Sequence, residues 1–223
     1  MLQTLNPTRT WSAVLFDLDG TIVDSAAGIV ESLAHTFKAM GATVPSDEIL
    51  RSYVGPPLLE ALRMQGGFTD VEAWNALTVY RDHYVDHAKH APVFPGVAGV
   101  LERLHEAGIP VALATSKPER MARSILDHLD LSKYFDVIAG ASEDETRSEK
   151  ADIVAEALAR LQAKGIDTSR SVMVGDRGYD TVGAAANGVP TILVEWGYGS
   201  PAEAHDAMAV VHSADQLRAL LLG

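Results

Sequence analysis

Two aspartates separated by one residue follow the first apolar run of the chain. Asp17 and Asp19 come directly after residues 13–16 (AVLF), and Gly20 and Thr21 come next. Residues two apart on an extended chain point to the same side, so this spacing aims both carboxylates at one small volume. Two like charges that close need a bound cation, or a division of labour in which one carboxyl stays protonated. An ordinary Asp-Gly turn is the simpler alternative.

Three later segments also place polar residues at or near the ends of apolar runs. They contain Thr115, Ser116 and Lys117, then Lys150, and finally Asp176 and Asp180. Together with the first pair they offer carboxylates for a hard cation, hydroxyl and amide groups for an oxyanion, and an ammonium that balances charge. Phosphoryl transfer requires this set of groups. Each segment also has a simpler alternative as a helix cap, a solvated side chain or a turn.

The elements that would position these residues alternate between strand and helix. Apolar runs predict strands at 13–16, 110–115, 135–139, 172–174, 191–194 and 209–211, and helical patterns lie at 97–107, 118–129, 148–163, 179–187 and 214–222. Apolar strands that alternate with helices indicate an α/β fold, with a parallel sheet covered on both faces. Because all strands of such a sheet end at one edge, the four polar segments should converge there.

Residues 25–90 show helical patterns alone. Apolar side chains recur at spacings of three and four in Ile29, Leu33, Phe37 and Met40, and further helical patterns lie at 58–64 and 70–87. This segment is expected to be an insertion after the first strand. We predict a core of residues 1–22 and 92–223, and a helical cap of residues 23–91.

Composition limits the classes of partner and metal site. The chain has 223 residues, 30 acidic and 18 basic side chains, a net charge of −12 and no cysteine. Without a Lys/Arg cluster, nucleic acid is not an expected partner. The lack of cysteine excludes disulfides and thiolate sites, so any metal must be held by oxygen or imidazole.

Neither a leader nor a membrane segment is apparent. Residues 1–10 do not have a charged region followed by an apolar stretch, and no run approaches the roughly 18 apolar residues of a membrane span. We therefore expect no signal peptide, no membrane partner and a cytoplasmic location.

The four polar segments, taken in order, resemble the four motifs of the haloacid dehalogenase-like hydrolases. The matching residues are Asp17-Leu18-Asp19-Gly20-Thr21, Thr115, Lys150, and Gly175-Asp176-Arg177 with Asp180. The insertion is similar to the cap of the phosphoglycolate phosphatase-like branch. Residues 54–58, 135–140, 147–150 and 197–200 resemble a bacterial 5'-nucleotidase-like or phosphoglycolate phosphatase-like subgroup. This resemblance implies a Rossmann-like core with an inserted all-helical cap.

The resemblance also implies roles for the motif residues. Asp17 would attack phosphorus and form an aspartyl-phosphate, while Asp19 would protonate the leaving oxygen and later take a proton from water. Phosphoryl oxygens would be held by Thr115, Lys150 and backbone amides near Ser116.

A magnesium ion is the implied cofactor. Its ligands would be the Asp17 carboxylate, the Asp19 main-chain carbonyl and Asp176, with Asp180 as a further ligand or as the partner of one. The resemblance thus points to a magnesium-dependent phosphatase acting on a small phosphorylated metabolite, with phosphoglycolate or a nucleoside 5'-monophosphate as leading substrate. The enzyme would be a monomer or a homodimer.

Two alternatives remain open. One is a sugar phosphomutase of the beta-phosphoglucomutase type, which uses the same motifs but shields its aspartyl-phosphate from water. The other is a phosphate-binding regulatory protein without turnover, against which the intact Asp17 and Asp19 argue.

Two further features lie in the predicted cap. Residues 53–57 are expected to select the substrate, because the cap loop would lie over the phosphoryl group. His83, His87 and His90 have the spacing of a helical metal face, but we expect a structural or surface role because no fourth ligand stands nearby.

Overall fold

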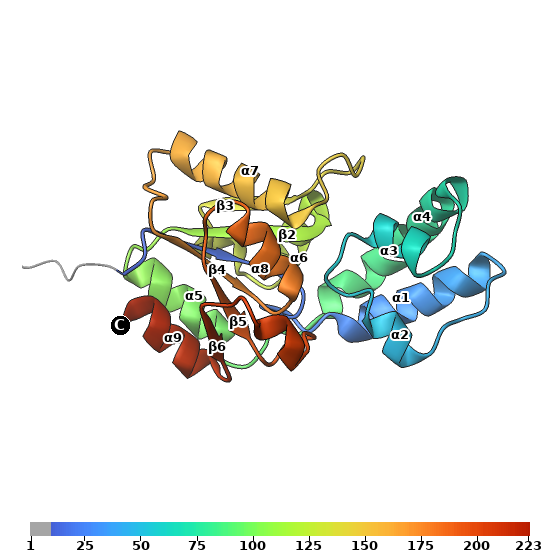
Figure 1. Ribbon diagram of the computed structural model, residues 1–223, viewed down its shortest axis with the longest axis horizontal. Helices are drawn as coiled ribbons and strands as arrows, with labels where there is room; N and C mark the ends of the chain where they lie inside the picture. Colours follow the sequence, from blue (N-terminus) through green and yellow to red (C-terminus); the bar gives the residue numbers. More distant parts are fainter. Residues whose placement is uncertain (1–9) are drawn as a thin grey trace, which may run out of the picture.

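A six-stranded parallel sheet forms the centre of the molecule (Figure 1), as seen in a computed structural model that describes residues 10–223. The strands lie in the order β3-β2-β1-β4-β5-β6, so the first strand of the chain is central. Their bounds are β1 Ala13–Phe16, β2 Val111–Pro118, β3 Val137–Ala141, β4 Ser171–Gly175, β5 Thr191–Val194 and β6 Ala209–Val211. The predicted α/β fold with a Rossmann-like sheet is confirmed.

Helices cover both faces of this sheet, which explains why its strands are apolar throughout. Along β1, Ala13 and Leu15 pack in one cluster with residues of α7 and α8, while Val14 and Phe16 pack in another with residues of α5, α6 and α9. The bounds are α5 Val97–Glu106, α6 Glu119–His128, α7 Lys150–Ala163, α8 Gly178–Ala185 and α9 Ala214–Leu222. Short 3-10 helices lie at η2 Ser132–Tyr134 and η3 Pro201–Ala204.

Four helices separate β1 from α5 and lie together beside the sheet in Figure 1; we call them the cap helices. They are α1 Ala26–Ala39, α2 Asp47–Arg51, α3 Leu58–Met64 and α4 Asp70–His87, and η1 Ala88–His90 follows them. A capping box starts α4, in which Thr69 and Glu72 each accept a hydrogen bond from the other's backbone. The two connections to the sheet lie side by side, since Val23 and Val93 form an antiparallel bridge. The division at residues 22/23 and 91/92 stays a prediction.

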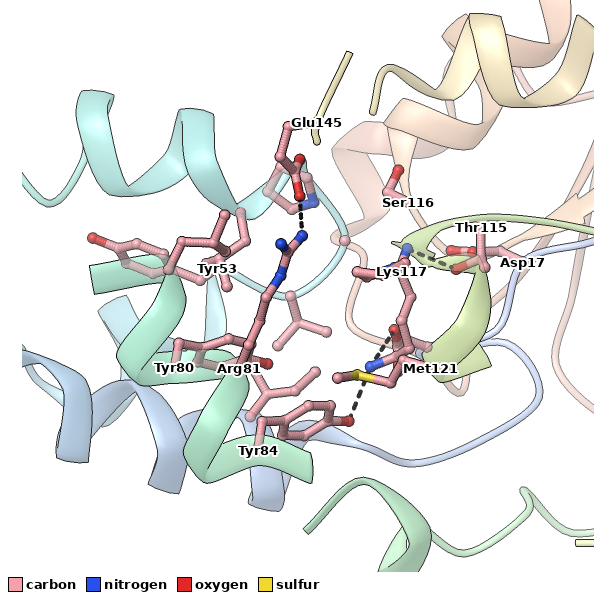
Figure 2. Close-up of a pocket in the computed structure, with 18 residues that line it drawn as sticks. Asp17, Tyr53, Tyr80, Arg81, Tyr84, Thr115, Ser116, Lys117, Met121 and Glu145 are labelled. Atoms are coloured by element: carbon pink, nitrogen blue, oxygen red, sulfur yellow. Dashed lines mark hydrogen bonds and ion pairs between the residues drawn. The ribbon is translucent and has the colours of Figure 1, made fainter. Parts of the chain in front are cut away.

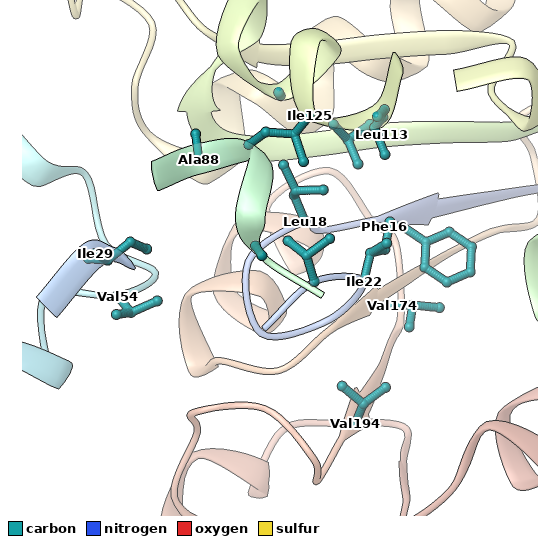
Figure 3. Packing of buried hydrophobic residues seen from close by; sticks show 14 of the residues in the cluster. Phe16, Leu18, Ile22, Ile29, Val54, Ala88, Leu113, Ile125, Val174 and Val194 are labelled. Carbon is teal, nitrogen blue, oxygen red and sulfur yellow. The ribbon is translucent and has the colours of Figure 1, made fainter. Parts of the chain in front are cut away.

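One apolar cluster includes residues of both the sheet and the cap helices, and Figure 3 shows some of its members. This cluster holds Phe16 and Val174 of the sheet, Leu18 and Ile22 of the β1–α1 segment, and Ile29 of α1. The cap helices are thereby held against the same edge of the sheet at which β1 ends.

Among the strands, β2 and β3 differ most from their predicted bounds. β2 continues to Pro118 because its register with β3 shifts between Thr115 and Pro118, whereas the apolar run predicted an end at Thr115. β3 starts at Val137 and not at residue 135, because η2 occupies the preceding turn. Among residues 10–223, no helix has the length and apolar character needed to cross a membrane. Residues 1–9, on which the signal-peptide prediction rests, lie outside the described residues.

Candidate active site

Asp17 lies directly beyond β1 and forms a buried ion pair with Lys150. The backbone N–H of Asp17 donates to the Val174 carbonyl at 2.9 Å, which extends the strand pairing by one residue. Lys150, the first residue of α7, places its Nζ 2.9 Å from Asp17 Oδ1 and 2.8 Å from Asp180 Oδ1. Residues from the first, third and fourth segments thus converge at one edge of the sheet, as the sequence predicts.

Three buried carboxylates form a group that fits a hard cation. One oxygen each of Asp17, Asp176 and Asp180 lies within 4.8 Å of the others. Burial, and then the nearby Asp180 and Asp17 charges, raise the pKa of the Asp176 carboxyl well above its usual range. Burial also raises the pKa of Asp180, with Asp17 adding to the effect and Lys150 opposing it. A divalent ion would offset this repulsion, and carboxylate oxygens are the ligands magnesium prefers.

Asp176 is held from two sides. Its carboxylate accepts hydrogen bonds from Thr21 Oγ1 at 3.2 Å and from the Tyr198 backbone N–H at 2.7 Å. A Cβ on Gly197 would lie 2.3 Å from the Asp176 Cβ, so only glycine allows the β5–β6 segment to approach this closely. The glycine between Trp196 and Tyr198 therefore serves the site, because it lets this segment approach Asp176.

Asp180 has two functions in the structure. Its Oδ2 accepts from the backbone N–H groups of Asp176 and Arg177, which caps the start of α8, while Oδ1 faces Lys150. The helix-cap alternative and the site interpretation therefore both apply to this residue. Whether Asp180 would contact a metal directly stays a prediction.

Asp19 faces a second buried lysine and is not part of the acidic group. Lys117 Nζ lies 3.1 Å from Asp19 Oδ2, donates to Tyr84 Oη at 3.0 Å and sits 4.3 Å from the Tyr84 ring centroid. Figure 2 shows this lysine between the core and α4. Metal binding through the Asp19 main-chain carbonyl stays a prediction.

Lys117 belongs to the second of the predicted polar segments, but the sequence predicted no role for it. Its signal is its position directly after a Thr-Ser pair at the end of a strand. Tyr84, on α4, carried no such signal, because its place in a helical stripe is equally typical of a core residue.

Thr115 and Ser116 do not cap α6, whose N-cap is Pro118. Thr115 Oγ1 accepts from the Lys117 backbone N–H at 3.3 Å. Among the described residues, the buried Ser116 Oγ and Asp19 Oδ1 have no hydrogen-bond partner. Buried polar atoms are normally paired, so these two are available to a ligand.

A cavity of about 70 Å³ connects these groups with the cap helices. It is lined by Asp17, Asp19, Thr115, Ser116 and Lys117 from the core, and by Tyr53, Val54, Gly55, Pro56, Tyr80, Arg81 and Tyr84 from the cap side. We call it the central cavity; Figure 2 shows its labelled side chains. The predicted cap loop therefore lines the same cavity as the two aspartates, and its role in specificity stays a prediction.

The histidines of α4 lie away from the central cavity. His83 Nδ1 is 3.0 Å from Ser32 Oγ, and its ring stacks on His35 and His87. Burial lowers the pKa of His83, and the two neighbouring imidazoles lower it further. These contacts join α1 to α4 and agree with the expected structural role.

Comparisons with known proteins agree with this geometry. A family model described as haloacid dehalogenase-like hydrolase matches residues 14–194. A Mycobacterium tuberculosis protein named tyrosine-protein kinase PtkA is 42% identical over 221 residues, which cover 97% of this chain and 74% of that protein. A 5'-nucleotidase of Pseudomonas aeruginosa is 34% identical over 203 residues, covering 91% and 90%. The crystal structure of a predicted phosphatase from Clostridium acetobutylicum has a TM-score of 0.88 and 35% identity, covering 94% and 97%.

Proposed function

The chain belongs to the haloacid dehalogenase-like hydrolases and is a phosphatase of that family, and from this premise we propose that it hydrolyses a small phosphomonoester through an aspartyl-phosphate on Asp17. One observation carries the proposal. The Asp17 carboxylate lines the central cavity, with Lys150 2.9 Å away and with Asp176 and Asp180 beside it. A nucleophilic carboxylate, a fixed ammonium and a site for a divalent cation are thereby combined at one strand end.

In the first half-reaction, an Asp17 oxygen would bond to phosphorus as the bond to the leaving oxygen breaks. Asp19, which lines the same cavity, would give its proton to that oxygen. In the second half-reaction Asp19 would take a proton from water as the water oxygen attacks phosphorus and releases phosphate and the Asp17 carboxylate. Asp19 must therefore be able to give a proton in the first half-reaction, and Lys117 connects it to Tyr84 of the cap helix α4.

Lys150 would serve both half-reactions by holding Asp17 in place. Burial on its own would lower the pKa of Lys150, but the Asp17 and Asp180 carboxylates more than offset this and raise it above the usual value. The ammonium therefore keeps its charge next to the phosphoryl oxygens. Thr115, Ser116 and the backbone amides near Ser116 would hold those oxygens, in agreement with the unpaired Ser116 Oγ.

Magnesium is the proposed cofactor, held by Asp17 and Asp176, with Asp180 as a further ligand or as support. When bound it would offset the negative charge of the phosphoryl group. The leading substrates are phosphoglycolate and nucleoside 5'-monophosphates, because proteins similar to this chain are named phosphoglycolate phosphatase and 5'-nucleotidase.

The test separates the roles of the two aspartates. We expect Asp17→Asn to form no covalent phosphoryl adduct with any ester, because the attacking carboxylate is gone. Asp19→Asn should still be phosphorylated on Asp17 by para-nitrophenyl phosphate, whose leaving group needs little protonation, but not by an alkyl phosphate. Mass spectrometry of each variant, quenched during reaction with magnesium, measures the adduct. An adduct on Asp17→Asn, or equal loss of Asp19→Asn reaction with both esters, contradicts the proposed roles.

A second candidate is transfer of the phosphoryl group from Asp17 to an acceptor hydroxyl in place of water. The 42% identity with a protein named as a tyrosine kinase favours it. Product analysis separates the two reactions. Free phosphate supports hydrolysis, a phosphorylated tyrosine peptide supports transfer, and an isomerised sugar phosphate supports the mutase alternative.

A further inference from the structure

Arg81 reaches from α4 to the core across the top of the central cavity. Its Nη1 donates to the Glu143 carbonyl at 3.1 Å, and its Nη2 pairs with the Glu145 carboxylate. Figure 2 shows the Arg81 side chain between the cap residues Tyr53 and Tyr80 and the core residue Lys117, with its guanidinium pointing at Glu145.

Glu145 is an unfavourable occupant of this position. It lies between β3 and α7 with φ of 59°, in the left-handed region that favours glycine. Its side chain is 9% exposed, and burial raises its pKa even though Arg81 opposes the shift. It also lines the central cavity together with Asp17 and Asp19. A phosphomonoester would add a further doubly charged group there, so the Glu145 carboxylate would repel the ligand.

Arg81 also marks the boundary of a larger space. A second cavity of about 460 Å³, which we call the outer cavity, shares Arg81, Pro118 and Met121 with the central cavity. Its charged lining residues are Arg81, Asp82, Lys89, Arg120 and Glu143. Cationic side chains outnumber carboxylates in this lining, although the whole chain carries a net charge of −12.

We propose that Arg81 is the anchor for a second anionic group of the substrate, and that Glu145 occupies this anchor until the substrate displaces it. The ligand class is a phosphoryl compound whose leaving group carries a carboxylate or a second phosphate. A guanidinium presents paired N–H donors that match two oxygens of either anion, so such a group can replace the Glu145 carboxylate directly. The inference rests on the proposed function, because it places the scissile phosphoryl group beside Asp17.

The test uses two non-hydrolysable probes of the same shape. Phosphonoacetate carries a phosphonate and a carboxylate, and 2-methylpropylphosphonate has an uncharged isopropyl group in place of the carboxylate. Calorimetry with magnesium should show that the unaltered protein binds phosphonoacetate at least tenfold more tightly. In Arg81→Gln this preference should disappear, and in Glu145→Gln phosphonoacetate should bind more tightly than it does to the unaltered protein, because its competitor has lost its charge.

Two further variants make the result decisive. Arg63→Gln removes another ion-paired cap arginine, which contacts Glu60 and Asp70 and does not line the central cavity, so it should keep the full preference. Arg81→Lys keeps the positive charge but lacks the paired N–H donors of the guanidinium. This variant should keep part of the preference for phosphonoacetate. Equal weakening of both probes by Arg81→Gln, or no preference in the unaltered protein, overturns the proposal. Because binding is measured without turnover, failure of the proposed hydrolysis would appear separately, as no phosphate release from para-nitrophenyl phosphate.

Discussion

At the scale of single residues, Lys150 shows how a buried charge is accommodated. A lysine ammonium has three donors, and here Asp17, Asp180 and the Ala114 carbonyl lie 2.9, 2.8 and 3.1 Å from its Nζ. Removal of one partner from a buried ion pair costs about 3–5 kcal/mol, because the remaining charge is left uncompensated. The same contacts fix the position of the proposed nucleophile, so stability and reactivity depend on one side chain.

The acidic group gives a prediction for magnesium. Asp17, Asp176 and Asp180 bring three carboxylates together against one lysine, so a divalent cation should stabilise the fold. At a magnesium concentration about 100 times its Kd, the free energy of unfolding should rise by about 2.7 kcal/mol. In Asp176→Asn less than half of this increase should remain, because one ligand charge is lost. Urea denaturation with and without magnesium measures both values.

The control for this prediction is Asp167→Asn. Asp167 is an exposed-loop carboxylate that accepts a hydrogen bond from the Ser169 backbone, outside the acidic group. This variant should keep the full response to magnesium. If Asp176→Asn responds to magnesium as strongly as the unaltered protein, Asp176 is not a ligand.

At the scale of elements, α4 meets the core through two side chains one turn apart. Arg81 and Tyr84 are three residues apart and therefore lie on the same face of the helix. Arg81 contacts the β3–α7 loop, and Tyr84 contacts Lys117, which in turn pairs with Asp19. Movement of α4 would therefore change the surroundings of Asp19, the proposed acid/base residue.

Tyr84→Phe tests this connection. Without the Tyr84 hydroxyl, Lys117 loses a hydrogen-bond partner and is held less firmly beside Asp19, so the proposed proton donor is less well positioned. We expect kcat for an alkyl phosphate to fall about tenfold, within the range of general-acid effects, and kcat for para-nitrophenyl phosphate to fall much less. Steady-state kinetics with both esters measures the difference. Tyr134→Phe, which alters a tyrosine outside the central cavity, is the matched control, and equal losses with both esters in Tyr84→Phe would refute the connection.

The elements also show what sequence patterns can predict. Apolar strands ending in polar residues were sufficient to place Asp17, Lys150 and Asp176 at one edge, because parallel strands share the direction in which they end. Lys117 and Tyr84 were not predicted as a pair, since their contact depends on the irregular register of β2 and on how α4 packs against the core. Helix α2 was missed because five residues, with Ile49 exposed, do not form an apolar stripe.

At the scale of the whole molecule, charge is distributed unevenly. The chain carries a net charge of −12, yet basic residues outnumber acidic ones in the lining of the outer cavity and of a third cavity, which shares Arg120 and Glu143 with it. The basic residues are Arg81, Lys89, Arg120, Arg123, Arg147 and Arg160, and the acidic ones are Asp82, Glu119 and Glu143. No linear cluster of basic residues reveals this surface in the sequence, because its members come from α4, η1, α6, the β3–α7 loop and α7. Only the folded arrangement brings them together around these two connected cavities.

This distribution predicts how salt should affect the enzyme. At about 10 mM ionic strength the Debye length is roughly 30 Å, so an approaching phosphomonoester dianion senses the net negative charge of the whole protein. At about 150 mM it is roughly 8 Å, and the basic residues near the cavities dominate. Therefore kcat/KM should rise several-fold between these salt concentrations at constant magnesium, as measured with para-nitrophenyl phosphate.

The double variant Arg120→Gln/Arg123→Gln tests how much the nearby basic residues contribute to kcat/KM. Both arginines are exposed on α6 and line the neighbouring cavities without belonging to the central one. Their removal should lower kcat/KM at the higher salt concentration. There, salt screens the charges of distant acidic residues, whereas charges within about 8 Å of the substrate remain effective. It should leave kcat unchanged, because neither side chain reaches the reacting groups. A kcat/KM that falls as salt is added to the unaltered protein would mean that the local basic residues already outweigh the net charge at low salt, and the predicted sign would be wrong.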